Sequence, residues 1–111
     1  MIRVVNKYHR DTRPDEVVVN IMRGTTIGNP FPMKDKSQAE RDRVCDEYNL
    51  WLRKRYADAS SPQRRELERL ADLVASGQKL ALECCCAPLR CHGLTIKAAI
   101  EGILRLRGKA A

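Results

Sequence analysis

The chain has 111 residues and a formal net charge of +7, and its length suits one domain with a single hydrophobic core. No apolar run approaches the ~20 residues that span a membrane, and no signal peptide opens the chain, so we expect a soluble, cytoplasmic protein without a membrane partner. The five cysteines are odd in number and three are consecutive at 84–86, which argues against a secreted disulfide scaffold and favours metal binding, catalysis or burial.

Two strands and a structured loop are predicted in the first third of the chain. Residues 2–6 form a short apolar run, and residues 16–22 contain consecutive β-branched side chains that suit a strand buried on both faces. Residues 7–15 predict a loop. Residues 23–32, RGTTIGNPFP, hold two glycines and two prolines and predict a second loop.

Three helices and one more strand are predicted in the remainder. Ser37, with Glu40 at the capping-box spacing, begins a helix to about residue 56. A second helix follows a Ser-Pro start at 61–62 and ends near a glycine at 77. Residues 79–84 predict a strand and residues 93–108 a final helix. The order β-β-α-α-β-α predicts one α/β domain over residues 1–111, a small Rossmann-like three-layer domain with a short, largely parallel sheet covered by helices.

Positive charge is concentrated in the terminal thirds of the chain. Residues 1–36 carry seven basic and four acidic side chains, and residues 77–111 carry six and two, whereas residues 37–76 carry eight of each. This excess favours an anionic partner, but charge alone does not separate a nucleotide from a nucleic acid.

The loop after the second strand is the first candidate binding segment. Its backbone amides, at Gly24 and Gly28, can cradle a phosphate or sugar, and Arg23 can hold an anion through two hydrogen bonds. Asn29, and Asn6 at the end of the first strand, are predicted to bond a sugar or base. The loop lacks the Walker lysine pattern, so an ordinary turn-rich connection stays equally open.

The segment 84–93, CCCAPLRCHG, is the second candidate, between the last strand and the last helix. Ligands bind at the carboxyl ends of parallel strands, and a helix N-terminus offers free N–H groups to an anion. Gly93 would allow close backbone approach. Cys91, beside an imidazole and near Arg90, is in conditions that favour a thiolate nucleophile, and His92 suits acid–base work or phosphate binding.

Two other interpretations of this segment stay open. Cys84, Cys86, Cys91 and His92 form a C-x-C-x4-C-H set of zinc ligands, although the adjacent Cys91 and His92 would struggle to point at one ion. The cysteines can also be small apolar core side chains with His92 as a helix cap, which we favour for Cys84 and Cys85. No cofactor is therefore firmly implied, and zinc is the weaker interpretation.

The two motifs also carry a family resemblance. Asn6-Lys7 after an opening strand, RGTTIGNPF at 23–31 and C-x-C-x-P-x-x-C-H-G at 84–93 together resemble phage and bacterial proteins grouped as domain of unknown function 4326. The resemblance covers nearly the whole chain. It implies a bacterial cytoplasm, or a host cytoplasm for a phage protein, but it implies no settled activity. An acidic residue often follows the motif's last glycine, and Leu94 stands there in this chain.

The sequence thus predicts a protein that binds a nucleotide or related phosphorylated ligand in a crevice between the 23–31 and 84–93 loops. Hydrolysis or transfer at a nucleotide bond, with Cys91 and His92 as catalytic residues, is the enzymatic form of this prediction. A nucleic-acid-binding accessory protein and a zinc-stabilised interaction module are the alternatives. A homodimer is one way to complete the crevice of so short a chain.

Overall fold

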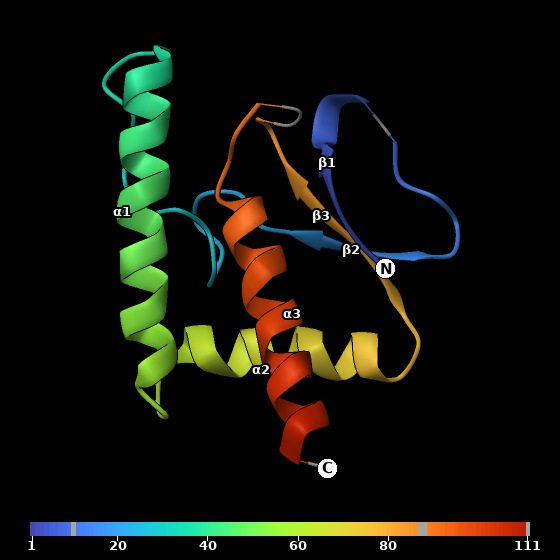
Figure 1. Ribbon diagram of the computed structural model, residues 1–111. Coiled ribbons are helices and arrows are strands. Elements are labelled where there is room, and N and C mark those ends of the chain that lie inside the picture. Colours follow the sequence, from blue (N-terminus) through green and yellow to red (C-terminus); the bar gives the residue numbers. More distant parts are fainter. Residues whose placement is uncertain (10, 87–88, 111) are drawn as a thin grey trace.

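The element order expected from the sequence is confirmed. The computed structural model describes residues 1–9, 11–86 and 89–110. Its elements are β1 (Ile2–Asn6), a 3-10 turn (Lys7–His9), β2 (Glu16–Asn20), α1 (Gln38–Ala57), α2 (Pro62–Ala75), β3 (Lys79–Cys84) and α3 (Gly93–Ala110) (Figure 1). β2 ends two residues before the predicted boundary because the Asn20 side chain accepts a hydrogen bond from the Met22 amide and turns the chain.

The three strands form one parallel sheet in the order β1-β3-β2 (Figure 1). β3 lies in the centre, with Leu82 in register with Val4 on one side and Val19 on the other. Because all three strands run the same way, their carboxyl ends meet at one edge of the sheet. The loops that follow β2 and β3 therefore leave the sheet next to each other.

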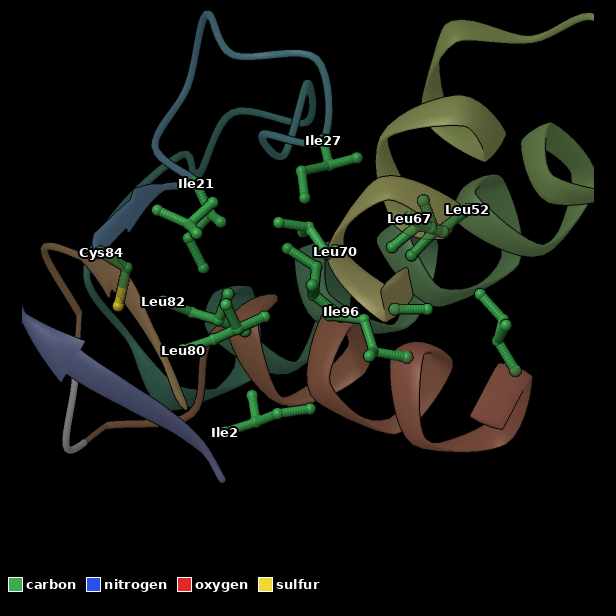
Figure 2. Packing of buried hydrophobic residues seen from close by; sticks show 14 of the residues in the cluster. Ile2, Ile21, Ile27, Leu52, Leu67, Leu70, Leu80, Leu82, Cys84 and Ile96 are labelled. Atoms are coloured by element: carbon green, nitrogen blue, oxygen red, sulfur yellow. The ribbon is translucent and has the colours of Figure 1, made fainter. Parts of the chain in front are cut away.

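The hydrophobic core lies between one face of this sheet and the helices. Leu80 and Leu82 are fully buried and point to the same face, because alternate residues of a strand do so. They belong to one cluster with buried residues of α1, α2 and α3, namely Tyr48, Leu52, Leu67, Leu70, Ala71, Ile96, Ile100 and Ile103. Figure 2 labels several members of this cluster, among them Leu67, Leu82 and Ile96, and shows them gathered between the strands and the helices.

The opposite face of the sheet differs from the expected arrangement. Arg3, Ala81 and Val18 are in register across it, and Val18 is 47% exposed. Arg3 reaches Glu16 with 2.6 Å between Nη2 and Oε1, and it also donates to the Asp11 carbonyl. Asp11, in the connection between β1 and β2, thus lies beside this face. The α/β class and the parallel sheet are confirmed, but in the described residues the helices of the core cover one face only, so the expected helical layer on the second face is missing.

The helix caps are those that the sequence predicts. The Ser37 hydroxyl accepts from the Glu40 amide at 3.2 Å, and the Ser61 hydroxyl accepts from the Arg64 amide at 3.1 Å. Both bonds satisfy amides that lack a partner within the first helical turn. Within the described part of the chain, no helix combines the length and apolar character needed to cross a membrane.

Candidate functional site

A pocket of about 260 Å³ lies where β2 and β3 end. It is bounded by residues between Met22 and Met33, by the first half of α1 and by residues 84–86 and 90–92. Both loops that the sequence singles out therefore contribute to one hollow. The predicted site residues that line it are Arg23, Asn29, Cys84, Cys86, Cys91 and His92.

Three arginines line this pocket. Arg90 is neutralised, since it forms ion pairs with Asp42 at 2.9 Å and Asp46 at 2.8 Å. Arg41 donates to the Arg90 carbonyl, and neither Arg41 nor Arg23 has a carboxylate partner among the described residues. No acidic side chain occurs among the described lining residues either. The pocket consequently carries two uncompensated positive charges.

Arg41 is a functional candidate that sequence reasoning missed. It lies in the first turns of α1, inside the middle third whose basic and acidic side chains balance. A count of charges along the sequence does not show which of them form ion pairs in the folded protein. Asp42 and Asp46 form ion pairs with Arg90, so Arg41 has no carboxylate partner among the described residues.

Cys91 is buried beside another thiol, whereas the sequence predicts an environment that favours a thiolate. Its sulfur is 3.3 Å from the Cys84 sulfur, and both residues are buried members of the core cluster. The hydrogen bond with Cys84, together with burial, raises the pKa of the Cys91 thiol. The Gly93 amide points at this sulfur at 3.4 Å. The expectation of a thiolate at Cys91 is wrong, because the surrounding thiol and apolar side chains favour the neutral form.

His92 connects the two loops instead of facing solvent. Its Nε2–H donates to the Ile21 carbonyl at the end of β2. Its ring meets the buried Tyr48 ring edge-on, with centroids 5.1 Å apart. Burial lowers the pKa of the imidazole, so His92 is neutral around pH 7. The carbonyl can only accept, and this selects the tautomer with its proton on Nε2.

The glycines serve packing and turns rather than ligand approach. A Cβ at Gly93 would lie 2.8 Å from Val4 Cγ1, so this glycine lets α3 begin directly against β1. A Cβ at Gly28 would lie 2.2 Å from the Met22 carbonyl oxygen. Gly24 has a φ of 92°, a left-handed conformation. None of the three is among the described residues that line the pocket.

Both candidate asparagines hold the backbone in place. Asn29 lines the pocket, but its Nδ2 donates to the Val44 carbonyl at 3.3 Å and its Oδ1 accepts from the Phe31 amide at 2.9 Å. Asn6 does not line the pocket. Its Oδ1 accepts from the Tyr8 amide at 2.8 Å and its Nδ2 lies 3.5 Å from the Cys85 carbonyl. The two side chains therefore fix the loops around the pocket.

The arrangement of the cysteines gives the zinc interpretation no support. All five cysteines are free, Cys85 is exposed and Cys86 is half-buried. No group of three or more His, Cys, Asp and Glu side chains within the described ranges is placed to hold a metal ion. His92 donates its Nε2–H to Ile21, so only its Nδ1 atom is left as an acceptor for a metal ion.

The fold and the pocket define a small parallel α/β domain with an arginine-lined hollow at the carboxyl edge of its sheet. The sequence model of the family described as Domain of unknown function (DUF4326) matches residues 4–102, and the chain belongs to this family. The match extends from β1 into α3 and includes both loops of the pocket. A search of curated proteins and a search of solved structures found no match.

Proposed function

We propose that this protein binds a nucleotide or a related phosphorylated ligand in the pocket between the 23–31 and 84–93 loops. The observation that carries the proposal is the pairing of Arg23 and Arg41 around one hollow without a carboxylate partner in the described structure. A guanidinium can donate two parallel hydrogen bonds to a phosphate, and this geometry makes arginine the preferred residue for such ligands.

The shape of the pocket supports a phosphate with part of a larger ligand. Its volume of about 260 Å³ lies below the roughly 300–1,000 Å³ of sites that enclose a drug-sized molecule. Phe31 and Met33 line it beside the arginines and offer an apolar surface to a sugar or base. The phosphate would lie between Arg23 and Arg41, with the remainder of the ligand reaching out of the pocket.

Binding has more support than a covalent step. A nucleophilic cysteine must be a thiolate, whereas Cys91 is buried and its pKa is raised by Cys84 and by burial. His92 donates its Nε2–H to Ile21 and therefore holds the pocket wall. The Nδ1 atom of this largely buried ring is the basic nitrogen that His92 has left for hydrolysis or transfer of the bound ligand.

A reducing, cytoplasmic location is part of this proposal. The five cysteines are odd in number and three are consecutive at 84–86, a pattern that does not suit a secreted disulfide scaffold.

The proposal is tested by isothermal titration calorimetry with nucleoside mono-, di- and triphosphates and with inorganic phosphate. Arg23→Ala and Arg41→Ala should each weaken binding roughly tenfold or more, because each removes a charge-assisted bond to phosphate. Arg65→Ala is the matched control, since Arg65 is exposed on α2 away from the pocket. It should bind as the wild type does.

Two results would reject this function. One is the absence of binding by every phosphorylated ligand in the panel to folded protein. The other is binding that survives both pocket substitutions, which would place the ligand elsewhere.

A further inference from the structure

A second, larger hollow adjoins the pocket. It is a groove of about 830 Å³ lined by one side of α1, by most of α3 and by Leu67 of α2. Figure 1 shows α1 and α3 both upright, with α2 running from the lower end of α1 across behind α3. Leu94 and Leu106, which line the groove, are 54% and 65% exposed.

The charged side chains of the groove are all arginines. Arg53 comes from α1 and Arg105 from α3, and neither forms an ion pair with any described residue. The Arg105 guanidinium lies back over its own helix, with Nη2 3.7 Å from the position of a Cβ at Gly102. Among the described residues that line the groove, none is acidic. Two further uncompensated charges thus face this hollow.

The groove and the pocket are adjacent. Arg90 and Cys91 line both, so the segment that carries them forms the wall between the two hollows. A ligand that leaves the pocket over this wall enters the groove. It then passes from Arg23 and Arg41, past the paired Arg90, to Arg53 and Arg105.

We propose that the ligand of the pocket is the end of a short single-stranded oligonucleotide that continues into the α1–α3 groove. This inference rests on the proposed function, since it places the terminal phosphate between Arg23 and Arg41. Successive phosphates lie along the arginines of this path, as in proteins whose basic groove tracks the backbone of a single strand. The bases cover the exposed side chains of Leu94 and Leu106.

The volumes favour this ligand over a mononucleotide. The pocket, at about 260 Å³, lies below the size of sites that enclose a drug-sized ligand, whereas the groove beside it has about 830 Å³ and its charged lining side chains are also all arginines. The bases of a duplex could not contact the groove, because they are paired and stacked inside the double helix. Single strands present both phosphates and bases to the protein.

Fluorescence anisotropy with end-labelled single strands of about eight nucleotides tests the proposal, with DNA and RNA as separate arms. An unlabelled nucleoside 5′-monophosphate and the matching duplex serve as competitors. The single strand should bind at least tenfold more tightly than either competitor. Its affinity should fall with salt, since each neutralised phosphate of a single strand contributes about 0.7 to the logarithmic slope.

The double variant Arg53→Ala, Arg105→Ala should lose tenfold or more in oligonucleotide affinity. Its salt slope should become shallower by about 1.4, the value for two phosphate contacts. Lys54→Ala removes a charge from the same helix but outside the groove, and should bind oligonucleotide as the wild type does. Circular dichroism and thermal unfolding verify that each variant is folded.

The outcomes separate this inference from the function on which it rests. Equal affinity for the mononucleotide and the single strand, or unchanged oligonucleotide binding by the double variant, overturns the inference while the pocket function stands. Tighter binding of the duplex also overturns it. If neither mononucleotide nor oligonucleotide binds, both proposals fail.

Discussion

His92, the residue before α3, donates its Nε2–H to the carbonyl of Ile21, the residue after β2. This bond joins the two segments that bound the pocket, which are 71 positions apart in the chain. The Tyr48 hydroxyl adds a second connection by donating from α1 to the Ile27 carbonyl at 2.6 Å. Two buried hydrogen bonds therefore hold the pocket in shape.

The first prediction concerns the pH dependence of stability. Burial lowers the pKa of His92 in the folded protein, so the unfolded chain binds a proton more readily. The stability associated with neutral His92 is complete above the unfolded pKa of about 6.5 and is lost as the pH falls through the lower folded pKa. Urea unfolding should therefore show a smaller free energy of unfolding at about pH 5.5 than at about pH 7.5.

A non-titrating variant is the control for this prediction. The amide nitrogen of His92→Gln can replace Nε2 as donor to Ile21 but gains no proton in this range. The decline in stability between the two pH values should be smaller in His92→Gln than in the wild type. An equal decline in both proteins would show that His92 does not cause it.

The second prediction concerns thiol reactivity. Cys85 is exposed, whereas Cys84 and Cys91 are buried in the core and the pKa of Cys91 is raised. Iodoacetamide at about pH 7.5 should modify Cys85 first and leave Cys91 unmodified until the protein unfolds, because the thiolate is the reactive form. Peptide mass spectrometry measures the order of labelling. Rapid labelling of Cys91 in the folded protein would restore it as a candidate nucleophile.

The third prediction concerns the turn after β2. Gly28→Ala places a Cβ 2.2 Å from the Met22 carbonyl oxygen, a backbone atom that cannot move aside cheaply. The variant should lose about 2–4 kcal/mol of unfolding free energy, in the range of strongly destabilising substitutions. Gly108→Ala is the matched control, since a Cβ there meets no atom within 4 Å and alanine favours a helix. Chemical denaturation of both variants compares the two effects, and a neutral Gly28→Ala would contradict the packing described.

The fourth prediction concerns the face of the sheet without helices. The hydrogen bond from Arg3 lowers the pKa of Glu16 to about 2, with further bonds from the Arg13 backbone. The stability from this pair is present above the ordinary glutamate pKa of about 4.3 and is lost as the pH falls through the folded value. Nuclear magnetic resonance titration of the Glu16 carboxyl should show this low value, and Arg3→Met should raise it toward the ordinary range. No change in Arg3→Met would exclude Arg3 as the main cause.

The elements of the fold were predictable from local sequence. Consecutive valines at 17–19 indicated a strand, and Ser37 and Ser61 marked helix starts that the structure reproduces. The valine run did not reveal that only one face of the sheet is covered by helices. Val18 is exposed because the crossover to α1 and α2 lies entirely on the opposite side.

The candidate site was only partly predictable. The two loops could be paired because the carboxyl ends of parallel strands meet at one edge. The protonation states of Cys91 and His92 could not be predicted, because they depend on contacts with Cys84 and Ile21 and on burial among residues distant in the sequence. The role of Arg41 could not be predicted, because it lies in a segment whose basic and acidic residues are equal in number. Only the folded protein shows that Asp42 and Asp46 form ion pairs with Arg90 and not with Arg41.

The sequence by itself determined the order of strands and helices, the family resemblance and the excess of positive charge, because these depend on neighbouring residues and composition. Tertiary structure decided which arginines stay unpaired around the pocket and the groove. It also decided that Cys91 and His92 are buried, neutral parts of the wall. The charge partners of a side chain and its degree of burial depend on residues far apart in the chain. Both are therefore fixed only when the fold brings those residues together.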